Sequence, residues 1–314
     1  MHIHTNLQQL PAWNNAVITI GTFDGVHTGH RQIIQLMLEE AAKINGETVI
    51  ITFHPHPRHV IASNQSPVFL LNTMDEKAAQ LATLGIHHLV IIPFTEDFSL
   101  QSAEGYIEDF LVKHFHPHTI IIGHDHRFGN SRKGDLQLLE SMAPQFGYTV
   151  KEIPGFMQQD ILISSTRIRE ALQKGDIQSA NHFLGYPYQF EGTVVEGNKL
   201  GRTIGYPTAN LQLVQSNKLV PGNGVYAVNV SAYFKDGSHV QKSGMMNIGI
   251  RPTVEGTQRM IEVNIFDFDQ EIYGENITVT IKTRLRNEQK FTGLDQLKEQ
   301  LAKDKESALA ALAS

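Results

Sequence analysis

Between residue 16 and about residue 153, short apolar runs rich in β-branched residues alternate with longer segments whose apolar residues recur at helical spacing. Strands that alternate with helices predict parallel strands joined by right-handed crossovers, and hence a doubly wound α/β sheet. Thr73 with Glu76 predicts a capping box, and Gly85 predicts the stop of the same helix. The predicted strands are Ala16–Gly21, Thr48–Phe53, His88–Phe94, Thr119–Gly123 and Tyr148–Ile153; the predicted helices are Gly29–Lys43, Met74–Leu84, Ala103–Phe115 and Asp135–Phe146.

The pattern changes after two further predicted helices, Thr166–Lys174 and Ile177–Leu184, at the turn that begins with Gly185. Beyond it, short β-branched runs are separated by turn residues, as at Lys235-Asp236-Gly237, without helices between them. This pattern predicts a small antiparallel β-barrel, followed by an amphipathic helix over Leu294–Leu312. We therefore expect one domain over residues 1–185 and a second over residues 186–314. The predicted barrel strands are Phe190–Val195, Gly224–Ala232, Lys242–Ile248, Ile261–Phe266 and Ile277–Arg284.

Composition narrows the class of protein. The chain has 314 residues, more than one hydrophobic core usually serves. Its formal charge of -6 argues against a surface that coats nucleic acid, and its lack of cysteine excludes disulfides and thiolate catalysis. It shows neither a signal-peptide pattern nor an apolar run of membrane-spanning length. We expect a cytoplasmic protein without nucleic-acid or membrane partners, and the sequence identifies no partner protein.

The stretch from Gly21 to His30 follows the first predicted strand and opens the first predicted helix. Glycines allow a tight turn and close approach of a ligand, and the free N–H groups of a helix start attract phosphate. His27 and His30 are three residues apart, so their imidazoles are neighbours once the helix has begun. Two other interpretations stay open: a helix-capping turn with solvated histidines, and a metal site built on the pair.

Polar residues follow the other predicted strands, where parallel strands present ligands at their carboxyl ends. They include His54-Pro55-His56-Pro57-Arg58, the run Gly123–Gly134 with Asp125 and Arg127, and Ser164-Ser165-Thr166-Arg167-Ile168-Arg169. Together they predict a pocket rich in donors, which a polyphosphate requires. Each also has a structural interpretation: a rigid proline turn, a turn-forming Asp125 with a surface Arg127, an N-cap at the serines, and a solvated face for the arginines.

Two stretches of the second domain also carry candidate chemistry. In the first, residues 197–210, the glycines allow N–H groups to line an anion. Thr208 and Asn210 alternate to one side of an extended segment, and such oxygen ligands suit Mg²⁺. In the second, residues 260–268, Glu262 stands between apolar neighbours as a candidate general base. The alternatives are a wide hairpin loop for the first stretch and an outward-facing strand residue for Glu262.

These motifs resemble, in order and over nearly the whole length, those of the bacterial bifunctional riboflavin kinase/FAD synthetase family. The motifs of the first domain are similar to the nucleotidyltransferase module, which transfers AMP from ATP to FMN. Those of the second domain are similar to the riboflavin kinase module, a small β-barrel. The matching stretches are Gly21–His30, Thr52–Pro57, Gly123–Gly129, Ser164–Arg169, Gly201–Asn210, Pro221–Tyr226, Asn247–Thr253 and Glu262–Gly274.

The resemblance implies two reactions and a role for each matched residue. Riboflavin is phosphorylated to FMN by ATP, and FMN is adenylylated by a second ATP to give FAD and pyrophosphate. Because the FMN phosphate is already ionised, the second reaction needs positioning and charge neutralisation rather than a base. The implied catalytic residues are Glu262 in the barrel and His27, His30 and Arg169 in the α/β domain. The implied nucleotide-binding residues are Gly21, Phe23, Asp24, Gly25, Ser164, Ser165, Thr166, Gly201 and Gly205; the flavin-binding residues are His56, Pro57, Asp125 and Arg127; the Mg²⁺ ligands are Thr208 and Asn210.

The sequence departs from the family pattern at His124 and His126, which flank Asp125, and at Asn264, where the family often carries histidine. The alternatives are a single-function nucleotidyltransferase with a non-catalytic flavin-binding barrel, a flavin sensor without turnover, and a metal-dependent hydrolase built on the histidines.

Overall fold

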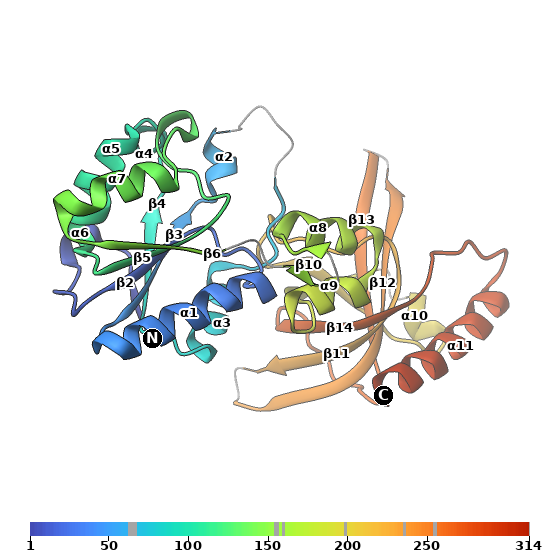
Figure 1. Cartoon of the computed structure of the whole chain (residues 1–314). Coiled ribbons are helices and arrows are strands. Elements are labelled where there is room, and N and C mark those ends of the chain that lie inside the picture. Colours follow the sequence, from blue (N-terminus) through green and yellow to red (C-terminus); the bar gives the residue numbers. More distant parts are fainter. Residues whose placement is uncertain are drawn as a thin grey trace. The chain divides into compact units, whose positions relative to one another are not determined.

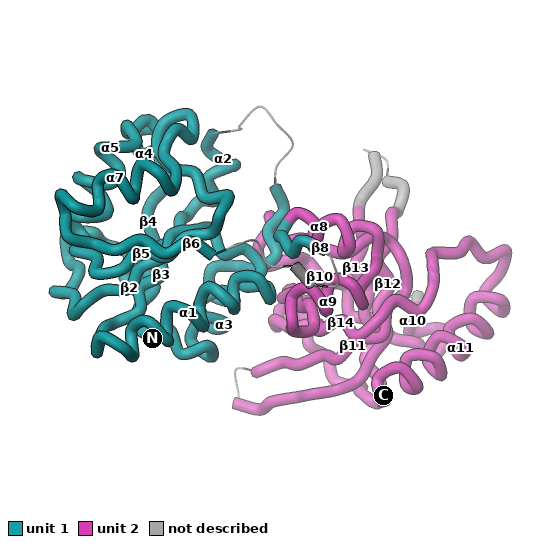
Figure 2. Tube along the Cα trace, viewed as in Figure 1, with its two compact units in different colours: residues 1–165 teal, residues 166–314 magenta. Residues whose placement is uncertain are grey.

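The computed structural model describes residues 1–61, 68–153, 157–158, 161–197, 200–234, 237–253 and 256–313. Asn198, Lys199, Lys235 and Asp236, which the sequence places in turns, lie outside the described residues. The chain divides into two compact units, residues 1–165 and residues 166–314 (Figure 2), and each is described by itself. This division counts the helices α8 and α9 with the second unit. The predicted boundary after residue 185 stays a prediction.

A six-stranded parallel sheet forms the centre of the first unit, in the order β1-β4-β3-β2-β5-β6 (Figure 1). The chain winds outward from β2 in both directions, so the order reverses between β2 and β5, where such sheets bind ligands at the carboxyl ends of the strands. The doubly wound prediction is confirmed. The strands of this unit are β1 (His2–His4), β2 (Val17–Ile20), β3 (Thr48–His54), β4 (His88–Pro93), β5 (Thr119–Gly123), β6 (Thr149–Ile153), β7 (Met157–Gln158) and β8 (Ile161–Leu162).

Alternation along the strands divides the apolar core between the two faces of the sheet. Ile18 of β2 points into the cluster that packs against residues 103–115 and α7. Val17, its neighbour, points to the other face, against Ile34 and Met37 of α1. A strand buried on both faces reads as a continuous apolar run, which explains why short β-branched apolar runs located the sheet. The helices are η1 (Leu7–Gln9), α1 (Thr28–Ile44), α2 (Pro57–Ile61), α3 (Met74–Thr83), α4 (Glu96–Ser99), α5 (Ala103–Gly105), η2 (Tyr106–Val112), α6 (Lys113–Phe115), η3 (Asn130–Arg132) and α7 (Leu136–Phe146).

The four predicted helices of the first unit are present, and the predicted capping box joins Thr73 and Glu76 at the start of α3. The helix predicted over 103–115 contains a seven-residue π-helix, η2, between two short α-helical turns. The edge strand β1 was not predicted, because three residues carry no measurable period. The short α2 and α4 were missed for the same reason.

The second unit is a closed barrel of antiparallel strands in the order β10-β13-β12-β11-β14-β9. Every predicted barrel strand is present. The sixth strand, β10, was not predicted as a strand, and only its first two residues, Ala209 and Asn210, belong to the stretch 197–210. Its pairing with both β9 and β13 closes the barrel. The elements are α8 (Ser165–Lys174), α9 (Ile177–Leu184), β9 (Gln189–Val195), α10 (Leu200–Thr203), β10 (Ala209–Leu213), β11 (Gly224–Tyr233), β12 (His239–Thr253), β13 (Gly256–Ile265), β14 (Asn276–Arg286) and α11 (Leu294–Ala313).

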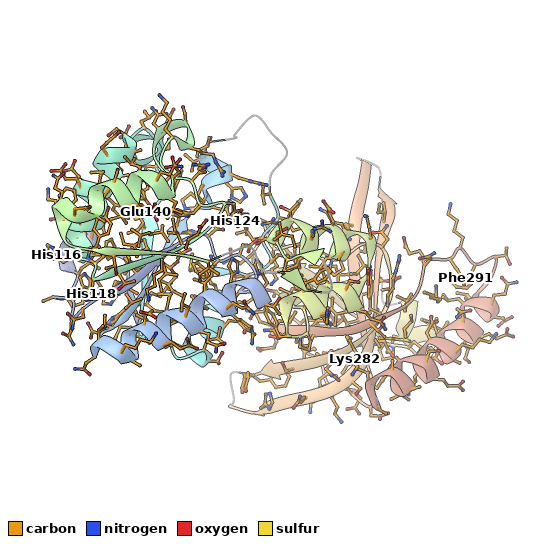
Figure 3. The ribbon with its side chains drawn as sticks, viewed as in Figure 1. His116, His118, His124, Glu140, Lys282 and Phe291 are labelled. Carbon is orange, nitrogen blue, oxygen red and sulfur yellow. The ribbon has the colours of Figure 1, made fainter. Side chains whose placement is uncertain are left out.

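A buried ion pair holds the C-terminal helix α11 against the barrel. Arg286, at the end of β14, donates from Nε and from one terminal nitrogen to the two carboxylate oxygens of Asp304, at 2.8 and 2.7 Å. Gln300, one turn earlier on α11, donates to the same carboxylate. Phe291, labelled in Figure 3, lies under the Arg286 guanidinium in the connection between β14 and α11. Within the described residues, no helix combines the length and apolar character needed to cross a bilayer.

Candidate active sites

The turn after β2 has an unusual backbone. Phe23, Gly25 and Val26 all have positive φ, at 47°, 89° and 37°. Glycine adopts this conformation freely, but a β-branched valine does so only under strain, which costs about 1–3 kcal/mol at such positions. The surrounding structure therefore forces this turn into a shape that its own residues do not prefer.

The hydrogen bonds of the Asp24 carboxylate help to hold the turn in this shape. Asp24 is 2% exposed and accepts hydrogen bonds from the backbone N–H groups of Leu71, at 2.9 Å, and Asn72, at 3.2 Å. Its own carbonyl accepts a hydrogen bond of 2.8 Å from the Ser165 hydroxyl. Three segments distant in sequence are therefore joined at one residue: the turn, the entry to α3 and the first residue of α8.

His27 and His30 lie together at the start of α1, as their spacing predicts. Their rings stack with centroids 3.6 Å apart, and the ring of Phe23 lies 4.7 Å from that of His30. His27 is 6% exposed and caps the helix, because its Nδ1 accepts the His30 N–H at 3.3 Å. The capping interpretation is thus correct for His27, but the histidines are not solvated. Since Nδ1 accepts, the neutral ring carries its proton on Nε2, from which it can donate to a ligand.

The imidazole of His30 has two features that would favour binding of an anion. Loss of solvation, followed by the charges of His27 and Lys77, holds the pKa of His30 well below its ordinary value. Among the described residues, the buried Nδ1 of His30 has no hydrogen-bond partner. A nearby phosphate would reverse both effects, since it accepts a hydrogen bond and favours the protonated ring.

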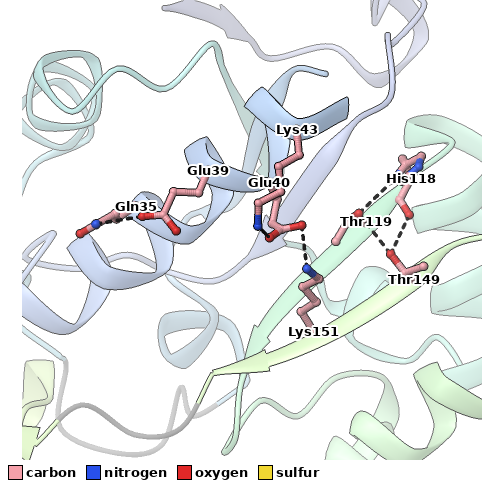
Figure 4. A network of polar contacts seen from close by, with 8 residues as sticks. All are labelled: Gln35, Glu39, Glu40, Lys43, His118, Thr119, Thr149 and Lys151. Atoms are coloured by element: carbon pink, nitrogen blue, oxygen red, sulfur yellow. Dashed lines mark hydrogen bonds and ion pairs between the residues drawn. The ribbon is translucent and has the colours of Figure 1, made fainter. Parts of the chain in front are cut away.

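The far end of α1 is fixed to the sheet, which keeps its first turn in place. Glu40 of α1 accepts from Lys151 of β6 at 2.6 Å and from Lys43 at 2.7 Å (Figure 4). These two lysine partners lower the pKa of the Glu40 carboxyl. The Glu40 carboxyl therefore remains charged at neutral pH.

The predicted flavin-binding residues of the first site lie on separate elements of the first unit. Pro57 begins α2, and His56 directly precedes it, where its Nδ1 accepts the N–H of Arg58. Asp125 is exposed in the turn after β5. Arg127 donates to Asp135 at 2.6 Å, and Asp135 caps α7, so Arg127 has a structural partner.

The serine segment enters the second unit. Ser164 precedes α8, Ser165 begins it and contacts Asp24, and Thr166 and Arg169 follow on the same helix. Thr166 is exposed and Arg169 is half-buried. Ser165, the last residue of the first unit, is therefore the residue of this segment that is bonded to the turn.

The second site is a pocket of about 270 Å³ in the barrel unit. Its apolar side is lined by residues such as Ile204, Met245 and Leu301, and its polar side by carboxylates, amides and a hydroxyl. Gly201, Thr208 and Glu262 of the predicted site line it, whereas Gly205 does not. The polar lining residues are Thr208, Asn247, Glu262, Asn264, Arg286, Glu288, Gln289 and Asp304.

Strand register places two amides beside Glu262. Asn210 of β10 and Asn247 of β12 are its direct partners on the neighbouring strands. Directly opposed residues of antiparallel strands point to the same face, so the three polar side chains form a row. Glu262 is half-buried and faces the pocket, which favours the catalytic interpretation over an outward-facing strand residue.

Asn210 is held ready to bind a ligand. It is 7% exposed, and its Oδ1 has no hydrogen-bond partner in the part of the chain that the structure describes. Gly197 makes room for it, because a Cβ at that glycine would lie 2.0 Å from Asn210 Nδ2. Asn264, a departure from the family pattern, donates to the carbonyl of Pro207 at 2.6 Å and so supports the segment that leads to Thr208.

Sequence reasoning missed Asn247 and Glu288, both of which line the pocket. Asn247 could have been found by aligning the predicted strands in register with Glu262. Glu288 comes from the connection between β14 and α11, which has no period, so nothing in the sequence pointed to it. No three histidine, aspartate or glutamate side chains of the described residues are grouped as ligands of a metal ion.

In comparisons with known proteins, two family models match successive parts of the chain. The family model described as FAD synthetase matches residues 9–167, and the one described as riboflavin kinase matches residues 184–312. The bifunctional riboflavin kinase/FMN adenylyltransferase of Escherichia coli strain K12 is 38% identical over 303 residues, which are 96% of this chain and 94% of that protein. The protein of the same description from Bacillus subtilis strain 168 is 37% identical over 298 residues, covering 94% of this chain and 92% of that protein.

A crystal structure described as a macrolide-efflux protein from Streptococcus pneumoniae has a TM-score of 0.85 to this chain at 32% sequence identity. The similarity covers 98% of this chain and 97% of that one. The arrangement of elements is therefore shared over nearly the full length.

The role of Asp24 leads to a stability prediction. Asp24→Ala removes the acceptor of two buried N–H groups, each of which costs about 1–3 kcal/mol when left unpaired. We expect the free energy of unfolding to fall by about 3 kcal/mol, and by roughly half as much in Asp24→Asn, which keeps one acceptor oxygen. Chemical denaturation measures this. The exposed Asp109→Ala is the control, and an equal loss in both alanine variants would contradict the assignment.

Proposed function

The chain belongs to the bifunctional riboflavin kinase/FMN adenylyltransferase family, and we propose that its two reactions take place at the two sites described above. The enzyme phosphorylates riboflavin to FMN with ATP and then adenylylates FMN with a second ATP, giving FAD and pyrophosphate. Both matched family models describe enzymes, so a barrel that only binds flavin is not favoured.

We assign FMN adenylylation to a domain of residues 1–185 and riboflavin phosphorylation to a domain of residues 186–314. The matched ranges, 9–167 and 184–312, support this division. We also propose a cytoplasmic location, because both steps consume ATP.

In the adenylylation site, the chain binds and orients two phosphate-bearing substrates. An oxygen of the FMN phosphate attacks the α-phosphorus of ATP, and the bond to the departing pyrophosphate breaks. No base is required, so the rate comes from alignment and from donors aimed at the phosphoryl oxygens. His27 can donate from Nε2, and His30 offers a ring nitrogen that has no partner among the described residues; we also assign the guanidinium of Arg169 to this step. The observation that carries the proposal is the stacked histidine pair at the N-terminus of α1.

The strained turn and the serine segment shape the same site. We propose that Gly21, Phe23, Asp24 and Gly25 set the backbone that approaches the nucleotide, and we assign Ser164, Ser165 and Thr166 to nucleotide binding as well, on the strength of the Ser165 hydrogen bond to the Asp24 carbonyl. His56, Pro57, Asp125 and Arg127 are our candidates for contact with FMN, although Arg127 is already bonded to Asp135.

In the barrel, the terminal hydroxyl of riboflavin attacks the γ-phosphorus of ATP. Glu262 accepts the hydroxyl proton as the oxygen–phosphorus bond forms, and ADP leaves. We assign the isoalloxazine ring to the apolar side of the pocket, and we assign Gly201, which lines the pocket, and Gly205 to the nucleotide phosphates. A carboxylate in a row with two amides is oriented by its neighbours, as a general base must be.

The kinase site also suits a magnesium ion. Mg²⁺ prefers oxygen ligands and usually binds through few protein groups together with phosphates and water. The buried, unpartnered Oδ1 of Asn210 is such a ligand within the described residues, and the hydroxyl of Thr208 lines the adjoining pocket. We propose that Thr208 and Asn210 hold this ion, which when bound neutralises phosphate charge.

The first test separates the two activities at Glu262. Glu262→Gln removes the base but keeps the shape, so riboflavin phosphorylation should fall by about 100-fold or more. FAD formation from supplied FMN should remain within twofold of the wild type. Chromatography of flavin products measures both, with the exposed Glu191→Gln on β9 as control. Equal loss of both activities would contradict separate sites.

The reverse result is expected for the histidine pair. His30→Ala removes one phosphate donor, which typically costs about 3 kcal/mol in the transition state, or roughly 100-fold in rate. Pyrophosphate release from FMN and ATP should fall accordingly, while riboflavin phosphorylation is unchanged. His182→Ala, exposed on α9, is the control. An unchanged rate in His30→Ala would remove this residue from the site.

The magnesium proposal predicts a shift in metal dependence. Asn210→Ala removes one oxygen ligand, so riboflavin phosphorylation should require about tenfold more Mg²⁺ for half-maximal rate, with the dependence of FMN adenylylation unchanged. A titration of both activities with MgCl₂ tests this. A lower maximal rate with the same half-saturating Mg²⁺ would show that Asn210 acts otherwise.

A further inference from the structure

A buried ammonium lies beside the adenylylation site, and no residue pattern pointed to it. Lys77 stands in the first turn of α3, where its N–H donates to the carbonyl of Thr73 at 3.0 Å. It is 6% exposed. Lysine is almost never buried unless its charge has a partner, because removing an ammonium from water is costly. The position of Lys77 therefore requires an explanation.

The nearest negative charge is only a partial explanation. Asp24 stabilises the charged form of Lys77 through its own charge. The Asp24 oxygens, however, are engaged with the N–H groups of Leu71 and Asn72. Among the described residues, the Lys77 ammonium has no hydrogen bond or ion pair of its own. The Asp24 carboxylate thus accepts hydrogen bonds from two backbone N–H groups and interacts with Lys77 only through its charge.

The groups facing Lys77 from α1 are cationic or potentially so. His30 lies close enough that the charge of Lys77 lowers its pKa, in addition to the effect of His27. Arg31, the next residue of α1, donates to Gln80 of α3 at 3.4 Å, which shows that the two helices pack together here. Desolvation lowers the pKa of Lys77 to about 8, and Asp24 opposes that shift. An anion that binds beside these groups favours their protonated forms and so opposes both of these lowered pKa values.

We propose that Lys77 binds the phosphates of the adenylylation reaction, contacting the triphosphate of ATP or the pyrophosphate that leaves. This assignment rests on the proposed function of the His27–His30 site. As the bond between the α-phosphorus and the bridging oxygen breaks, its electron pair leaves on pyrophosphate, and the ammonium of Lys77 neutralises that charge. Lysine suits this task as a compact, strongly charged donor on a flexible stem.

The kinetic test uses the full-length enzyme and three variants. Lys77→Met keeps the length and apolar stem but removes the charge, Lys77→Arg keeps the charge, and Lys113→Met changes an exposed lysine of the same unit. For Lys77→Met we expect kcat/KM for ATP in FMN adenylylation to fall by about 10- to 100-fold, the range of a lost hydrogen bond to a charged group. Inhibition by added inorganic pyrophosphate should weaken by a similar factor. Lys77→Arg should recover part of both, and Lys113→Met should change neither.

A second measurement detects the charge of Lys77 directly. Burial lowers the pKa of Lys77 to about 8, so near this pH a bound polyphosphate that raises the pKa must draw a proton from solution. Calorimetric binding of α,β-methylene ATP in two buffers of different ionisation enthalpy gives the proton uptake. The wild type should take up a fraction of a proton, and Lys77→Met clearly less.

The outcomes separate this inference from the proposed function. If the wild type releases no pyrophosphate from FMN and ATP, the proposed function itself fails. If the wild type is active and Lys77→Met lowers kcat without changing the KM for ATP, the pyrophosphate inhibition or the proton uptake, then Lys77 only balances Asp24 and the inference is overturned. Thermal unfolding of each variant and its riboflavin phosphorylation rate identify any general loss of folding. If Lys77→Met does not fold, Lys77→Arg replaces it in the test. The inference is supported if the wild type takes up a proton and Lys77→Arg, with normal stability, does not. It is overturned if the wild type takes up no proton and Lys77→Arg leaves pyrophosphate inhibition unchanged.

Discussion

The first unit depends on one buried carboxylate. Asp24 holds the entry to α3 by two backbone hydrogen bonds, and its carbonyl holds the first residue of α8. The turn on either side of it carries positive φ at Phe23 and Val26, a conformation that isolated chains avoid. Binding energy within the fold thus maintains a backbone that would otherwise relax, and that backbone presents the stacked histidines.

Under the proposed function, the two sites act on different nucleophiles and use different residues for them. In the α/β unit the nucleophile is already an anion, so the site gathers donors and cations and uses few acids. In the barrel the nucleophile is a neutral hydroxyl, so a carboxylate faces the pocket, oriented by amides on both neighbouring strands. The residue types at each site follow from the protonation state of the group that attacks.

Much of the fold could be predicted because its signals are local. Strands such as Thr48–His54 are continuous apolar runs, and the capping box at Thr73 is a short pattern with a physical cause. The rest depends on contacts between distant residues. The edge strand β1 and the barrel strand β10 are defined by their partners rather than by their own periods. The burial of Lys77, and the pairing of Arg127 with Asp135, are likewise decided by tertiary packing.

The closed barrel has a consequence for errors in folding. In an open sheet, a terminal strand can pair one residue out of step and still form most of its hydrogen bonds, which would turn every side chain of that strand to the opposite face. Here β13 lies between β10 and β12 in a ring of six, so a slip of that strand must be accommodated at both seams. Closure of the barrel therefore fixes the register of β13, and with it the face on which Glu262 lies, because the barrel cannot close around a strand that is shifted by one residue.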